Sequence, residues 1–326
     1  MKKRFLVAAV AATLVSPLAA NAAATVYGNV HVSINSFDSA DNLDMSSNTS
    51  SVGVKGKEDL GGGMTALYKV EFQVDPTERN GTASNIDDAD TGASSKNSTA
   101  ALTDRDQWVG LKGAMGTVKF GTMSNNYKQT GSKVDPMYRT ALEGRGFMKT
   151  QSNMHSGAGE SRGRMTNTVQ FTSPKMSGVQ AVFNTTISGN DDETLGLGVR
   201  YTGTKNLLAY FDYLDTSAMQ AGSLDAAIKV GGKYKMDALT VGVQYEAVED
   251  AGVQGDTMFV SANYKMNDND NVAFTLGDND TDDMGFALMY NHKMSKRTNV
   301  YAGYGDNAST DANDDQLTTF GIRHKF

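Results

Sequence analysis

Apolar and polar residues alternate with a period of two through most of this chain, and that alternation limits the folds open to it. The pattern is clear in residues 25–35, 64–74 and 239–246. Beyond residue 22, no long stretch repeats its apolar residues at the 3.6-residue spacing of an amphipathic helix. A period of two places successive side chains on opposite faces of a β-strand. We therefore predict an all-β fold.

Sixteen segments of this kind can be counted along the chain. The prolines fit the assignment, because Pro76, Pro136 and Pro174 all fall between segments, where no strand hydrogen bond is lost. The predicted strands cover residues 25–35, 50–58, 64–74, 105–112, 117–122, 164–172, 179–187, 194–202, 207–215, 225–235, 238–248, 257–266, 271–277, 284–293, 298–305 and 317–326.

The first 22 residues have the features of an export signal. Residues 2–4 form a basic start, an apolar run follows over 5–15, and residues 20–22 supply small side chains for cleavage. We expect 1–22 to be a signal peptide and 23–326 to form a single barrel domain. Cysteine is absent, which excludes disulfides, thiolate metal sites and cysteine nucleophiles.

The connectors between predicted strands alternate in length. One set is short, as at 113–116 and 236–237, whereas the other set is longer and includes 75–104 and 123–163. This asymmetry is typical of outer-membrane barrels, and a mean hydropathy of −0.41 is too polar for a bundle of membrane helices. Lipid cannot satisfy an open sheet edge, so the sheet must close. We predict a 16-stranded antiparallel transmembrane β-barrel with long extracellular loops and short periplasmic turns. A large soluble β-sandwich and a secreted adhesin are the alternatives.

Aromatic residues near the predicted strand ends support a membrane location. Tyrosine and phenylalanine rings are enriched where a lipid-facing barrel meets water. The residues expected at these interfaces are Tyr27, Tyr68, Phe72, Tyr201, Tyr213, Tyr234, Tyr245, Tyr264, Tyr290, Tyr304 and Phe326.

Several segments resemble general Gram-negative trimeric porins, and the resemblance spans the chain beyond the signal. The segments are SVGVKGKEDLGGGMTALYKVEF (51–72), DRDQWVGLKGAMGTVKFGT (104–122), NTVQFTSPKMSGVQAVF (167–183), MSKRTNVYAGYG (294–305) and FGIRHKF (320–326). The chain departs from the family at Ser51, where an arginine is frequent, and the selectivity rules of the family are therefore in doubt here.

The resemblance implies a homotrimer in the outer membrane, in contact with lipid and lipopolysaccharide. Its channels are expected to pass ions and small hydrophilic solutes passively and to need no cofactor. Residues 123–163 match the loop that folds into the barrel and narrows it, and 75–104 matches the loop that latches onto a neighbouring subunit. Phe326 matches the terminal aromatic residue that the barrel-assembly machinery reads.

Charged residues of the inward loop and of the wall are the candidate site. The loop carries Asp135, Arg139, Glu143 and Arg145 within a net positive segment. On the wall, parity predicts that Lys55, Arg105, Gln107, Lys119, Arg164 and Gln170 face the lumen, with Trp108, Val118, Phe120 and Val169 facing lipid. We expect the cations opposite Asp135 and Glu143 to set up a transverse field, and the basic constriction to favour anions weakly despite many aspartates in the outer loops.

Other classes of function find little support in the sequence. The four histidines form no hydrolase motif, and no metal-ligand or phosphate-loop spacing is present, so no enzyme is expected. Basic runs that would bind nucleic acid are also missing. The alternatives are a surface adhesin or structural anchor with a blocked lumen, and a substrate-selective channel. The predicted loop has few aromatic residues, which favours a general pore over a sugar-specific one.

Overall fold

A computed structural model describes residues 24–38, 42–77, 102–155, 163–187, 189, 193–217, 226–249, 255–278, 284–307 and 316–326. The expected signal peptide, and most of the expected latch at 75–104, lie outside these residues. The elements are β1 (Thr25–Phe37), β2 (Asp44–Ser47), β3 (Ser51–Gly61), β4 (Met64–Gln73), β5 (Thr103–Gly113), β6 (Gly116–Ser124), α1 (Asn126–Gly131), η2 (Asn153–His155), β7 (Arg164–Thr172), β8 (Val179–Thr186), β9 (Leu195–Tyr201), β10 (Leu207–Asp215), β11 (Ala226–Met236), β12 (Leu239–Glu249), β13 (Thr257–Lys265), β14 (Asp270–Asp278), β15 (Gly285–Lys293), β16 (Thr298–Asp306) and β17 (Gln316–Lys325).

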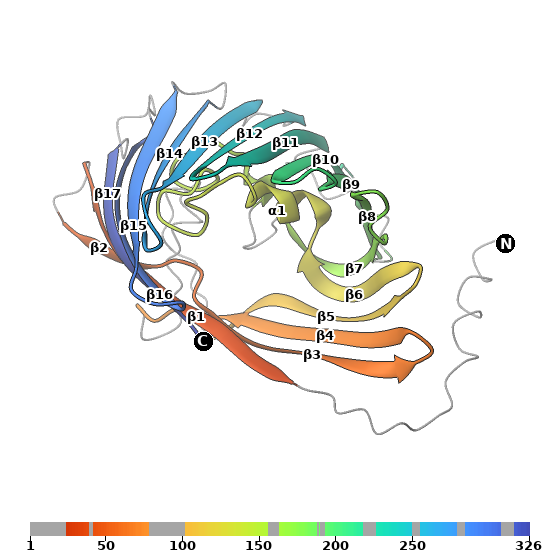
Figure 1. The fold of residues 1–326 in the computed structure, drawn as a ribbon. Helices are drawn as coiled ribbons and strands as arrows, with labels where there is room; N and C mark the ends of the chain where they lie inside the picture. The colour runs from red at the N-terminus through yellow and green to blue at the C-terminus, as the bar shows by residue number, and fades with distance from the viewer. Residues whose placement is uncertain are drawn as a thin grey trace.

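The strands form one antiparallel sheet that closes on itself (Figure 1). β1 closes the ring by pairing with β17, from Asn29 opposite Lys325 to Phe37 opposite Leu317. On its other side β1 pairs with both β2 and β3. These two are segments of a single wall strand, because both run along β1 and only residues 48–50 separate them. The wall therefore has sixteen strands, which confirms the predicted barrel.

Short and long connectors alternate around the ring. β3 and β4 are joined by two residues, as are β5 and β6, and β11 and β12. Gly61, Gly62 and Gly63 all have positive φ at the first of these turns, a backbone conformation that glycine adopts without steric cost. At the opposite end, 39 residues (125–163) separate β6 from β7. No helix among the described residues is long and apolar enough to cross a bilayer.

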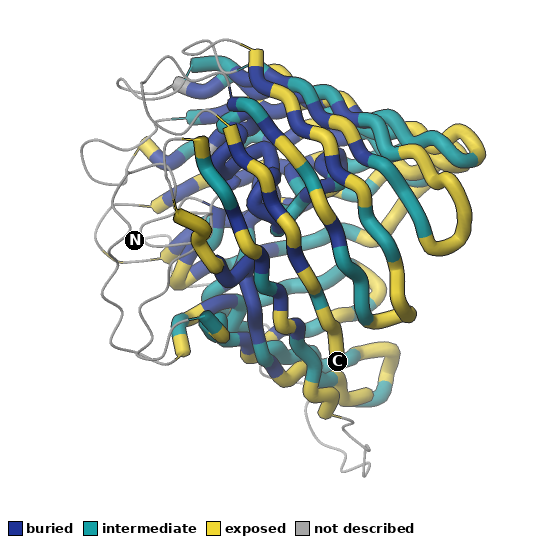
Figure 2. The backbone as a smooth tube through the Cα atoms, turned by 90° about the vertical axis from the view of Figure 1, so that its left-hand side faces the viewer, coloured by how far each residue is buried: buried dark blue, intermediate teal, exposed yellow. Residues whose placement is uncertain are grey.

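The two faces of the wall reverse the pattern of a soluble protein. Apolar side chains are exposed outside, for example Val26 at 64% and Phe320 at 53%, whereas Asn35 and Asp212 inside are fully buried. Figure 2 shows this alternation of exposed and buried residues along the strands. Such an exposed apolar surface is stable only when lipid covers it, because burying it in hydrocarbon removes it from water.

Candidate functional site

The segment after β6 turns back into the barrel, where α1 lies inside the ring of strands (Figure 1). Asn125 begins this short helix, because its side chain accepts a hydrogen bond from the Lys128 amide. We call residues 125–155, the described part of this connector, the inner loop. Most of its residues are buried against the wall.

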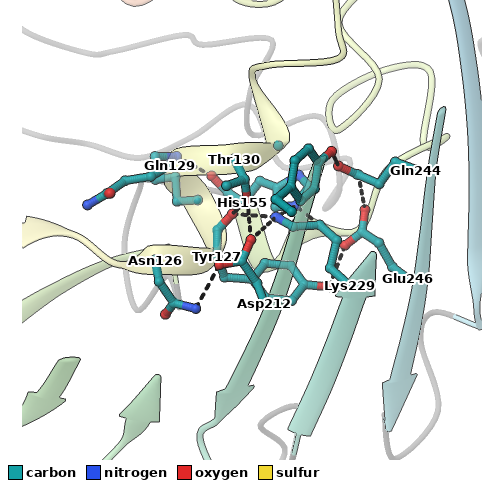
Figure 3. Close-up of polar contacts among 12 residues, drawn as sticks. Asn126, Tyr127, Gln129, Thr130, His155, Asp212, Lys229, Gln244 and Glu246 are labelled. Atoms are coloured by element: carbon teal, nitrogen blue, oxygen red, sulfur yellow. Dashed lines mark hydrogen bonds and ion pairs between the residues drawn. The ribbon is translucent and has the colours of Figure 1, made fainter. Parts of the chain in front are cut away.

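A polar network holds the inner loop to β10, β11 and β12 (Figure 3). Lys229 of β11 donates to the Tyr127 carbonyl and lies 3.0 Å from His155 Nε2 and 3.9 Å from the Asp212 carboxylate. Tyr127 donates to Glu246 of β12 over 2.7 Å. We call Tyr127, His155, Asp212, Lys229 and Glu246 the anchor network.

Further contacts complete the anchor network. Asn126 and Thr130 of α1 both donate to the Asp212 carboxylate, and Ser152 donates to Glu246. Asp212, Lys229 and Glu246 are fully buried, so each charge depends on these partners. Burial lowers the pKa of His155 well below its usual value and raises the pKa of Tyr127, so both loop side chains are neutral at pH 7.

An apolar cluster holds the other part of the inner loop to β14–β17. Leu142 and Met148 of the loop are buried there with wall residues that include Ala287 and Leu317. Gly303 and Gly305 of β16 allow this close approach, because a Cβ at either position would lie within 2.7 Å of the Leu142 side chain. The loop thus packs against β14–β17 here, and it reaches β7 as well, where Gln129 donates to Gln170 over 3.1 Å and Met165 is buried beside Tyr127.

Two carboxylates expected to face the lumen are instead buried inside the loop, which corrects the expected transverse field. Asp135 accepts hydrogen bonds from the Met137 and Gly144 amides at 2.7 and 3.0 Å and is 5% exposed. Burial raises the pKa of Asp135 to about 6. Glu143 is fully buried and pairs with Arg145 over 2.6 Å. The tight, irregular backbone of the loop leaves amide N–H groups without backbone acceptors, and the loop carboxylates accept hydrogen bonds from them instead.

The two loop arginines, Arg139 and Arg145, differ in burial and in their partners. Arg145 is mostly buried, because it pairs with Glu143 and also donates to the His155 carbonyl over 2.7 Å. Arg139 is half-buried and has a φ of +68°, held by a hydrogen bond from its amide to Glu143. Its left-handed backbone is costly for a residue with a Cβ, and such positions gather at functional sites.

Five charged residues of β4, β5 and β7 form a cluster on the lumen face of the wall. Lys69 contacts Glu71 at 3.1 Å and Asp106 at 2.8 Å. Arg105 pairs with Glu71 at 2.7 Å, and Arg164 pairs with Asp106 at 2.9 Å. Three cations thus share two carboxylates. We call these five residues the wall cluster.

The sequence reading missed part of the wall cluster. Lys69 and Glu71 lie on the polar face of their strand, so parity could have identified them. Asp106 was not predictable, because a β-bulge interrupts the pairing of β4 with β5 and directs both Arg105 and Asp106 inward. The same bulge reverses the next residues: Trp108 faces the lumen and Gln107 faces outward, contrary to the prediction.

Lys119 and Lys55 lie over aromatic rings. Lys119 Nζ is 4.5 Å from the centre of the Trp108 ring, and Lys55 Nζ is 4.7 Å from that of Tyr27. Tyr27 donates to Glu71 over 2.7 Å. The prediction that Tyr27 lies at the lipid interface is therefore wrong, since its ring is on the lumen side of β1.

Two cavities remain beside the inner loop, with volumes of about 650 and 370 Å³. Tyr138 lines both, and Arg139 lines the smaller one together with the wall cluster residues Lys69, Glu71, Asp106 and Arg164. The larger cavity is bounded by β13–β17, including Arg323 and Lys325. No group of described residues could hold a metal ion.

A closed sixteen-stranded barrel with an apolar exterior, a charged lumen and an internal loop defines a channel protein of the outer membrane. A family model described as Gram-negative porin matches residues 7–313, and the chain belongs to that family. It is located in the outer membrane and forms a diffusion channel. The family is one of channels rather than enzymes.

Individual proteins agree with this assignment. An outer membrane porin protein of Bordetella pertussis is 25% identical over the whole of both chains. The major outer membrane protein P.IB of Neisseria meningitidis serogroup B is 24% identical over 84% of this chain and 77% of its own. Among solved structures, the anion-selective porin from Comamonas acidovorans has the same fold, with a TM-score of 0.71, 20% identity, and coverage of 94% of this chain and all of its own.

Proposed function

We propose that the lumen is a filter for size and charge, which passes ions and small hydrophilic solutes with a weak preference for anions. One observation carries the proposal: three cations near the cavities, Arg139, Arg323 and Lys325, have no carboxylate partner among the described residues, whereas Glu71 and Asp106 are already paired with cations. No described carboxylate forms an ion pair with Arg139, Arg323 or Lys325. Glu71 and Asp106 each contact two cations.

Charge at a narrow passage acts on an ion over a short, poorly screened distance, so it outweighs charge at a wide mouth. Lys119 adds a further positive charge to the lumen, because its partner is the Trp108 ring and not a carboxylate. Lys55, Arg105 and Arg164 belong to the same proposed pore lining. Asp135, Glu143 and Arg145 support the lining from within the loop, because they are buried.

The inner loop supplies the size filter in this proposal. Sixteen strands alone enclose a wide aqueous channel. The loop fills one side of it through the anchor network and the apolar cluster, and the remaining cavities are small.

Assembly partners are also part of the proposal. We infer a homotrimer inserted in outer-membrane lipid and lipopolysaccharide, with Phe326 as the signal for the barrel-assembly machinery. The Phe326 side chain is 46% exposed, and its backbone pairs with Gly28 at the seam between β17 and β1. An exposed ring at this seam is accessible to a receptor before the barrel closes.

Reconstitution in a planar bilayer tests the proposed filter. We expect openings in threes and, in a KCl gradient, a reversal potential that indicates preference for chloride. Lys119→Met and Arg139→Gln are each expected to move that potential toward zero, whereas Lys175→Met, at an exposed turn, serves as the matched control. A folded barrel that inserts but never conducts would refute the proposal and favour an adhesin or structural anchor.

A further inference from the structure

Four asparagines on adjacent strands form a row across the lumen wall at the larger cavity. Asn271 of β14 donates to Asn263 of β13 over 2.9 Å. Asn291 of β15 donates to Asn271 over 3.0 Å, and Asn299 of β16 donates to Asn291 over 2.6 Å. All four line the cavity of about 650 Å³. We call them the amide row.

The amide row retains unused hydrogen-bonding capacity. A side-chain amide has two N–H donors and an oxygen with two lone pairs, and each link of the row uses only one donor and one lone pair. The four side chains are half-buried, so one edge of each faces the cavity. An array of paired donors and acceptors is suited to hydroxyl groups, which donate and accept at the same time.

Arg323 continues the row on the next strand. It lies directly opposite Asn299 in the β16–β17 register, and its Nε donates to Asn29 of β1 over 3.2 Å. Its terminal nitrogens bind no described residue. This hydrogen bond fixes the guanidinium plane, and a fixed guanidinium fork binds a carboxylate through two parallel hydrogen bonds.

The surroundings of Arg323 favour an anion. Lys325 lines the same cavity, and Arg139 is close enough to repel both cations electrostatically. Three positive charges without a described carboxylate partner repel one another, and a bound anion relieves that repulsion. Tyr138 of the inner loop faces the same cavity and supplies an aromatic surface.

We propose that Arg323 and the amide row form a binding site for a polyhydroxylated carboxylate, an open-chain sugar acid. The carboxylate binds the Arg323 guanidinium, and successive hydroxyls bind Asn299 and Asn291. Neighbouring strands lie about 4.8 Å apart, so these three residues cover about 10 Å, the length of a short sugar-acid chain. The inference rests on the proposed channel and identifies a solute class for it.

Block of the chloride current tests the site in wild-type protein. Potassium gluconate is compared with potassium hexanoate, which has the carboxylate but no hydroxyls, and with sorbitol, which has hydroxyls but no charge. We expect gluconate to reach half-block at a concentration at least about fivefold lower than either control, as two or more extra hydrogen bonds would give. Equal block by gluconate and hexanoate would overturn the site while leaving the channel established.

Variants locate the site. Asn291→Leu is expected to raise the half-blocking gluconate concentration about fivefold, and Arg323→Met about tenfold or more, because the hydrogen bond it loses is charged. Gln180→Leu removes a lumen-facing amide outside this cavity and is the matched control. If Asn291→Leu does not fold, Asn299→Leu replaces it, because Asn299 is the other proposed hydroxyl contact.

Failure of the site and failure of the channel give different results. Channel opening is recorded before any solute is added. A protein that forms no channel refutes the proposed function, and calorimetry of gluconate binding to the detergent-solubilised protein then still decides whether the amide row binds. Unchanged gluconate block in Asn291→Leu and Arg323→Met would overturn the assignment to these residues.

Discussion

Replacement of Lys229 by methionine is expected to release the inner loop from the wall. Lys229 is fully buried, and its ammonium faces Asp212, the Tyr127 carbonyl and His155 Nε2. Methionine has a similar length but no charge, so Asp212 and Glu246 would remain buried as two carboxylates without their shared cation. Breaking one member of a buried ion pair costs about 3–5 kcal/mol.

That cost applies to docking of the loop more than to the barrel. The backbone hydrogen bonds between strands are unchanged in K229M. The inner loop loses the contacts of the Lys229 ammonium and is then held by the apolar cluster around Leu142 and by its other hydrogen bonds to the wall. If half of the cost falls on docking, about 2 kcal/mol, the fraction of undocked loop rises about thirtyfold. We therefore expect larger and noisier single-channel currents and faster entry of larger sugars.

Liposome swelling with sugars of increasing size measures the size limit, and bilayer recording measures the current noise. Lys233→Met is the matched control, because Lys233 lies on the same strand and the same face but outside the anchor network. The reasoning is refuted if K229M and K233M have the same size limit and the same noise while both run as folded barrels.

Three further predictions concern the charges of the lumen. Glu71→Gln leaves the wall cluster one charge more positive. For an ion passing about 10 Å away, Coulomb's law with Debye screening predicts that the anion-to-cation permeability ratio rises about 1.7-fold in 0.1 M salt and about 2.7-fold in 0.01 M salt. Glu58→Gln, at an exposed position, is the control. The pKa of Asp135 is about 6 in the folded protein and about 3.8 in the unfolded chain, so between these pH values the folded state binds one proton more. The free energy of unfolding should therefore fall by up to about 3 kcal/mol as the pH rises from about 4 to 6. Thermal unfolding of wild type and Asp135→Asn measures this change, and a difference between the two proteins that does not vary with pH would contradict the assignment. Arg139→Gly should reduce preference for chloride yet stabilise the fold by about 1 kcal/mol, because glycine adopts the positive φ without strain; a clear loss of stability would show that the backbone is not strained.

The wall was predictable from the sequence because its strands obey a single rule. Lipid-facing residues are mostly apolar, so the period of two marked the wall strands to within three residues at each end, apart from the start of the strand that β2 and β3 form together. The rule fails where the backbone departs from regular pleating. The bulge at Arg105 and Asp106 reversed the predicted directions of Gln107 and Trp108, and the interruption at 48–50 hid the short β2.

The inner loop was far less predictable. Its place in the chain follows from its length and from the family resemblance, but its contacts do not follow from any period. Asp135 and Glu143 look like pore charges in the sequence, yet they serve backbone and side-chain donors within the loop. Lys229 and Glu246 lie on regular strands and have no sequence feature that distinguishes a buried anchor from a solvated wall charge.

The seam between β1 and β17 has a consequence for how the protein folds. Asn29 and Lys325 are paired there, although almost the whole chain separates them. Such distant contacts carry a high loop-closure entropy and slow folding. Until the last strand is made, β1 has an unpaired edge that invites aggregation. The barrel therefore cannot close before β17 has been synthesised, and until then the chain needs protection from pairing with other chains.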